Sequence, residues 1–149
     1  MTPHFTLAEL TVTDHRTLDN TPDPIALANL QRLAEFLERV REVLGGKPVM
    51  VNSAYRSKAV NDAVGSKDTS QHRVGCAADI RVPGMTPDAV VKAVMASGLA
   101  YDQLIREFDS WTHISIPNLA TAAPRKMALI IDKTGTRLFP ADPTGLAAG

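Results

Sequence analysis

The chain has 149 residues, and 16 lysines and arginines balance 16 aspartates and glutamates, so the formal net charge at pH 7 is zero. This length predicts one domain, because it buries enough apolar surface without covalent staples. The balanced charge argues against a nucleic-acid or anionic-membrane partner, and the apolar runs are too short to span a bilayer. A single cysteine excludes an internal disulfide.

The N-terminal stretch MTPHFTLAELTVTDH carries acidic and polar side chains where a secretory signal would need an apolar run. We therefore expect a protein that is made in the cytoplasm without a signal peptide. Separately, we expect it to be a monomer. If it acts elsewhere, something other than its own leader must deliver it.

The first long predicted element is a helix that begins near Pro24, with Asp23 as its N-cap. Gly45 and Gly46 are expected to end it, because glycine adopts the left-handed cap conformation without strain. Apolar residues recur at steps of three and four, which predicts one buried helical stripe. The stripe consists of Leu30, Leu33, Leu37, Val40 and Leu44.

The next segment, PVMVNSA over 48–54, is typical of a strand. A short helix is predicted over 57–64, where Gly65 stops it, and 66–75 has the composition of a loop. The run AADIRV over 77–82 predicts a second strand.

A third helix is predicted to begin with Thr86 as N-cap and Pro87 as its first residue, and to end at Gly98. Its apolar residues are expected to be partly buried. These are Val90, Val91 and Val94.

Residues 101–108 and 111–116 predict two strands, separated by a tight turn at Asp109-Ser110 or joined through a bulge. Residues 127–139 predict a hairpin, and the last ten residues, rich in Pro, Ala and Gly, are expected to fray. Strands and helices mix without strict alternation. The sequence therefore predicts an α+β fold, with a small antiparallel sheet and flanking helices.

His72 and Asp79 stand seven residues apart, with small residues between them that let the backbone approach a metal closely. Zinc binds imidazole nitrogen and carboxylate oxygen, and a catalytic zinc site has three protein ligands. Strand alternation turns His113 away from the more apolar face of WTHISI, so it is the candidate third ligand. The spacing alone is a weak signal, and a structural histidine is the alternative. His4 and His15 are expected at the surface.

The pattern S-x-H-x-x-G-x-A-x-D over 70–79, followed by W-x-H over 111–113, resembles the zinc D-Ala-D-Ala carboxypeptidase-like metallopeptidases (LAS type). That group includes D,D-carboxypeptidases, D,D-dipeptidases and the L-alanyl-D-glutamate endopeptidases of phage lysins. The resemblance covers roughly residues 5–117, over which the motifs follow one another as in the short phage and prophage members. It implies a zinc site on the sheet, with ligands His72, Asp79 and His113.

A zinc peptidase also needs a general base. The resemblance implies an acidic residue shortly before the last histidine, commonly three positions earlier, where this chain has Ser110. We therefore expect Glu107 to be the base, with Asp109 as the second choice. On one regular strand, both would point to the face that carries His113. The alternative is that both are solvated turn charges.

The resemblance further implies that Arg56 stabilises the oxyanion, although a surface ion pair is the bland alternative. Ser70 and Tyr55 are implied to hydrogen-bond the substrate. Trp111 is expected to pack against the site strands or to line a cleft. Cys76 is expected to be a small buried filler and not a nucleophile.

These observations predict a zinc-dependent peptidoglycan peptidase that hydrolyses cell-wall peptides containing D-amino acids, by metal-activated water and a carboxylate base. D,D-carboxypeptidase and endopeptidase action both stay open, and the expected setting is a phage lysin or virion protein acting on the wall. We expect a peptidase domain over 1–117 and a C-terminal extension over 118–149 packed on the same domain. Because Ser110 departs from the family pattern, the alternative is a non-catalytic zinc-containing wall-binding or phage structural module.

Overall fold

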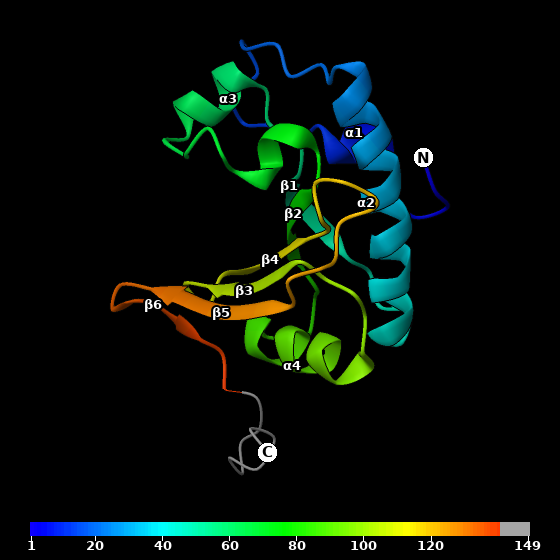
Figure 1. Ribbon diagram of the computed structural model, residues 1–149, viewed down its shortest axis with the longest axis vertical. Helices are drawn as coiled ribbons and strands as arrows, with labels where there is room; N and C mark the ends of the chain where they lie inside the picture. The colour runs from blue at the N-terminus through cyan, green and yellow to red at the C-terminus, as the bar shows by residue number, and fades with distance from the viewer. Residues whose placement is uncertain (141–149) are drawn as a thin grey trace.

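A six-stranded sheet forms the centre of the computed structural model, which describes residues 1–140 (Figure 1). The strand order is β1-β2-β4-β3-β5-β6, and every neighbouring pair is antiparallel except β3 and β5. The strands are β1 (Met50–Ser53), β2 (Ala77–Arg81), β3 (Gln103–Glu107), β4 (Trp111–Ser115), β5 (Met127–Asp132) and β6 (Gly135–Leu138).

The α+β class is confirmed, but the sheet departs from the expected antiparallel pattern at one pair. Residues 116–126 carry the chain from the end of β4 past the start of β3. As a result β5 begins where β3 begins, with Met127 opposite Gln103, and the two strands run parallel.

The long helix α2 (Pro24–Val43) forms as its sequence predicts. The Asp23 carboxylate accepts a hydrogen bond from the Ala26 N–H, and Pro24 occupies the first turn, where a missing N–H costs nothing. All five residues of the expected apolar stripe are buried.

The helix α4 (Pro87–Ser97) begins at its Thr86 cap and ends at Gly98, which takes a left-handed φ of 77°. Its three valines are fully buried, more than the partial burial expected. The reason is that α4 and α2 share one side of the sheet, where both contribute to the main hydrophobic core (Figure 1). The sheet contributes Ile80, Leu104 and Ile114 to this core.

Three short elements complete the described fold: α1 (Leu7–Leu10), α3 (Lys58–Ala63) and the 3-10 helix η1 (Gln71–Val74). The sequence analysis did not predict α1, although Thr6 and Glu9 form a capping box, a pattern typical of a helix N-terminus. It also took the η1 segment for loop. The turn forms there because the Ser70 hydroxyl caps it and Gly75 closes it in the left-handed conformation.

Residues beyond β4 pack on the sheet and are tied to it by a buried carboxylate. Asp102 accepts hydrogen bonds from the Arg125 guanidinium at 2.6 Å and from the Gln71 amide at 3.1 Å. β5 and β6 form a hairpin over the segment where one was expected. The expected fraying of the last ten residues falls mainly on 141–149, which lie outside the described residues.

Among residues 1–140, no helix combines the length and the apolar character that crossing a bilayer requires.

Replacing Gly75 by alanine should destabilise the protein more than replacing Gly65. Both have a left-handed φ, of 79° and 76°, so both substitutions strain the backbone by about 1–2 kcal/mol. A Cβ at Gly75 would also lie 2.7 Å from the Ala26 carbonyl oxygen, whereas one at Gly65 meets nothing within 4 Å. We expect Gly75→Ala to lose roughly 1–3 kcal/mol more in urea unfolding. Equal losses would contradict this packing argument.

Asp102→Asn should lower the free energy of unfolding by roughly 1–3 kcal/mol, because it removes the charged acceptor of a buried network. Burial alone would raise the pKa of Asp102, but the bonds from Arg125 and Gln71 outweigh burial and hold that pKa below its usual value. The stabilisation is therefore present above the unfolded pKa of about 3.9 and lost as pH falls further. Urea titrations should show a smaller deficit at pH 3 than at pH 7. Asp62→Asn, at an exposed side chain of α3 that pairs with Lys58, is the control and should change little.

Candidate metal centre

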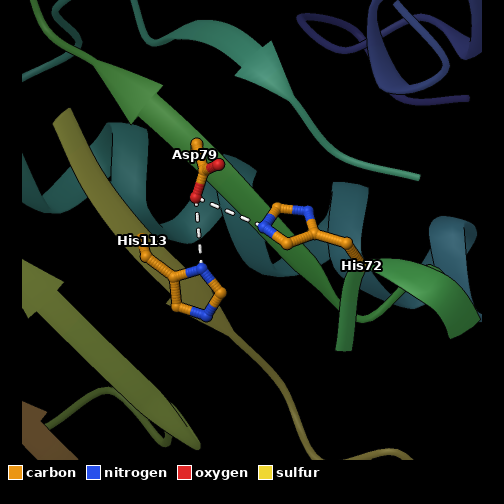
Figure 2. A group of neighbouring side chains, drawn as sticks. All are labelled: His72, Asp79 and His113. Atoms are coloured by element: carbon orange, nitrogen blue, oxygen red, sulfur yellow. Dashed lines mark hydrogen bonds and ion pairs between the residues drawn. The ribbon is translucent and has the colours of Figure 1, made fainter. Parts of the chain in front are cut away.

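Three buried side chains converge on one point of the sheet face away from α2 and α4. His72 Nε2 lies 3.3 Å and His113 Nδ1 lies 3.1 Å from the same oxygen, Oδ1 of Asp79. Figure 2 shows both rings turned toward that oxygen. The centroids of the two rings are 5.2 Å apart. The ligand atoms of these three residues all lie within 4.8 Å of one another, which is close enough to hold one metal ion.

The sheet register brings two of the three together. Asp79 in β2 lies directly opposite His113 in β4, so both side chains leave the same face of the sheet. Their neighbours Ile80 and Ile114 point to the opposite face, into the core. Strand alternation therefore predicted the orientation of His113 correctly.

His72 reaches the same point from η1, and the segment after β1 holds it in place. Its ring Nδ1 lies 2.6 Å from the Ala54 carbonyl oxygen. Its own carbonyl accepts the Arg56 N–H at 2.9 Å. Because Nδ1 donates to a carbonyl, Nε2 is left as the acceptor nitrogen that faces Asp79.

Gln103 orients the other imidazole, and sequence reasoning missed it. Its Oε1 lies 3.2 Å from His113 Nε2, so it accepts the ring N–H and leaves Nδ1 facing Asp79. Sequence alternation alone puts Gln103 and Glu107 on one face of β3. The register of β3 and β4 shows that this is the face that carries His113.

The chemistry of this donor set fits zinc. Zinc–nitrogen and zinc–oxygen bonds of about 2.0–2.1 Å in a tetrahedron place neighbouring ligand atoms about 3.3 Å apart. The separations of 3.1 and 3.3 Å around Asp79 Oδ1 agree with that spacing. Burial alone would raise the pKa of Asp79, but when both rings are protonated, the charge and hydrogen bonds of His72 and His113 outweigh burial and hold that pKa well below its usual range. In the neutral tautomers described above, the two ring nitrogens instead offer lone pairs to a metal ion. The site therefore offers an ionised carboxylate and two imidazole nitrogens.

Glu107 is the acidic residue that the structure brings to this group. Its Oε1 lies 4.0 Å from His113 Nδ1, and its Oε2 accepts the Trp111 indole N–H at 3.1 Å. Burial and the nearby Asp79 charge raise its pKa, against the opposing effects of His113, Trp111 and Arg56.

Asp109, the second-choice base, lies apart from the three residues. The chain reverses through left-handed φ values at Phe108 and Asp109, so 107–113 is not one regular strand. The Asp109 side chain is 72% exposed and faces Arg106 at 3.8 Å. Ser110, where the family pattern places an acid, donates its hydroxyl to the Phe108 carbonyl within the same turn.

Arg56 lies on the other side of Asp79. Its guanidinium donates to Asp79 Oδ2 at 3.3 Å and to the Ser53 hydroxyl at 3.2 Å. The side chain is largely buried, so it is not the exposed surface ion pair that was the bland alternative. A cleft of about 130 Å³ opens beside Arg56 and Ser53, walled by 12–15 and by Val60.

Three residues singled out from the sequence remain, namely Ser70, Tyr55 and Cys76. The Ser70 hydroxyl accepts the His72 N–H at 3.3 Å and so caps the turn that carries this ligand candidate. The Tyr55 ring is buried, and burial together with the Asp23 carboxylate raises the pKa of its hydroxyl. Cys76 is buried as expected, and burial raises the pKa of its thiol, which disfavours a nucleophilic thiolate.

Comparison with known protein families gives one match, to the family described as Peptidase M15, over residues 3–115. The matched span contains all three members of the metal-binding group and Glu107, and it ends before β5. No curated protein matches the chain.

Zinc binding should depend on the ligand candidates and on Gln103 to different degrees. We expect His113→Ala to abolish zinc retention, because two ligands rarely hold such an ion. Gln103→Leu should weaken zinc affinity roughly 10- to 100-fold, because it removes only the acceptor that orients His113. Competition with a chromogenic chelator measures both. His4→Ala, at an exposed histidine, is the control and should bind zinc as the native protein does. Native affinity in the His113 variant would rule out this site.

Proposed function

Since the chain belongs to the peptidase M15 family of zinc metallopeptidases, we propose that it hydrolyses peptidoglycan peptides that contain D-amino acids. The observation that carries the proposal is the convergence of His72, Asp79 and His113 beside a half-buried glutamate. The setting we propose is the bacterial cell wall, reached from a phage lysin or a virion, on the strength of the motif resemblance.

We assign the zinc ligands as His72 Nε2, Asp79 Oδ1 and His113 Nδ1. Zinc in such a site lowers the pKa of a water molecule and polarises a carbonyl oxygen. The surrounding hydrogen bonds keep the three ligand atoms aimed at one point. The Ala54 carbonyl and the Gln103 amide hold the two rings, and Arg56 holds the second carboxylate oxygen.

Glu107 is the proposed general base. Its Oε1 takes a proton from the attacking water as the new C–O bond forms, and returns it to the amide nitrogen as the C–N bond breaks. The raised pKa of this carboxyl suits a group that must hold a proton between the two steps. Asp109, exposed in the turn, lacks that environment.

Arg56 is proposed to stabilise the negative charge that develops on the carbonyl oxygen. It is the cation beside Asp79, and a guanidinium has five donors, of which the described contacts with Ser53 and Asp79 use two. We propose that the substrate follows the cleft along Arg56 and that the Ser70 hydroxyl contacts it. Tyr55 is the weaker candidate, because the residue is buried, and burial together with the Asp23 charge raises the pKa of its hydroxyl.

The proposed peptidase unit is 1–117, with the following segment as an extension that enlarges the sheet. Mass spectrometry of muropeptides digested with the zinc-loaded protein identifies the bond. A carboxypeptidase shortens stem peptides by a terminal D-alanine, whereas an endopeptidase cuts within stems or cross-links. If the protein sediments with the wall but releases no new amino groups, it is the non-catalytic wall-binding module, and the peptidase proposal is refuted.

Glu107→Gln should lower turnover by roughly 10²- to 10⁴-fold while zinc stays bound, because the amide cannot accept the proton. Asp109→Asn is the matched control and should keep both activity and zinc. Release of amino groups from purified peptidoglycan and metal analysis by mass spectrometry measure the two effects. If the Asp109 variant loses turnover and the Glu107 variant does not, the base assignment is wrong while the metal assignment survives.

A further inference from the structure

We propose that Trp111 is a positioning residue that fixes which oxygen of Glu107 faces the candidate metal site. This inference rests on the proposed function, in which Glu107 is the base. It assigns the side chain a task beyond the packing or cleft-lining expected from sequence.

The hairpin register places the indole where it can do this. Glu107, the last residue of β3, lies directly opposite Trp111, the first residue of β4, so both side chains leave the same face. The indole N–H donates to Oε2 at 3.1 Å. The other oxygen, Oε1, is the one that lies 4.0 Å from His113 Nδ1.

A carboxylate needs such a restraint at this position. The terminal torsion of a glutamate is broad and roughly two-fold, so nothing in the side chain itself selects one oxygen. The indole is a donor only, and therefore it binds one oxygen without competing for the proton that the other must accept. With Oε2 held, Oε1 keeps a constant orientation toward the three ligand candidates.

The turn between β3 and β4 also restrains the indole. Phe108, in this turn, adopts a left-handed φ of 51°, which is uncommon for a bulky residue. The centroid of its ring lies 6.4 Å from that of the Trp111 ring. The tryptophan therefore has a hydrogen bond on its β3 side and an aromatic neighbour on its turn side. This arrangement limits the rotamers from which it could release Glu107.

The test exploits the fact that the chain has a single tryptophan. Biosynthetic replacement by β-(3-benzothienyl)alanine puts sulfur where the indole has N–H and keeps the shape. Protein containing 4-fluorotryptophan, which retains the N–H, sets the reference rate for analogue incorporation. We expect the benzothienyl protein to lose kcat roughly 10- to 100-fold, with KM and zinc content unchanged. A kcat equal to the reference would show that Trp111 only packs, and would overturn the proposal.

A second measurement requires neither zinc nor turnover. The one indole N–H gives one side-chain signal in a ¹⁵N–¹H spectrum, and Glu107→Gln should shift it to higher field by weakening the acceptor. An unmoved signal would also overturn the proposal. If the native protein releases no amino groups while the signal does move, the proposed function fails and the hydrogen bond stands. Native activity together with an unmoved signal refutes the positioning role alone.

Discussion

The candidate metal centre depends on the pairing of Asp79 with His113 across β2 and β4. Because paired residues on neighbouring strands point to the same face, this one register sets two of the three ligand candidates side by side before any loop contributes. A shift of one residue would turn Asp79 into the core and Ile80 toward the site, at a cost in both places. The same alternation that buries Ile80 and Ile114 in the core therefore places the Asp79 carboxylate beside the His113 imidazole on the other face.

The third ligand candidate is positioned by a different means, because His72 lies on a short 3-10 turn and not on a strand. A single turn has little stability of its own, and here contacts at both ends hold it. The Ser70 hydroxyl caps its start, and Gly75 ends it with a backbone so close to α2 that no side chain fits. The Ala54 carbonyl then fixes the ring. The site thus combines a rigid sheet with a turn that is rigid only through its partners.

Much of this was predictable from sequence, since the signals were local. N-caps, helix-ending glycines and strand alternation predicted α2, α4 and the orientation of His113, and the motif pattern led to His72, Asp79 and Glu107. The parallel entry of β5 was not predictable in this way, because it depends on where a loop crosses the sheet and not on any residue within the strand. Gln103 and the Trp111 contact with Glu107 were missed for a related reason. Their partners stand 10 and 4 positions away and meet only once the register of β3 and β4 is known.

The position of β5 has a further consequence for the strand that carries Glu107. The family match ends at residue 115, and without the hairpin that follows, β3 would be the last strand of the sheet. Its outward N–H and C=O groups would then be free to recruit an extended segment of another molecule, the usual route to strand-mediated aggregation. β5 saturates those groups, and the exposed outermost strand becomes β6, which carries Arg137. The hairpin thus moves the unpaired border of the sheet away from Glu107, onto the four-residue strand β6, and a short edge strand offers few groups for another chain to pair with.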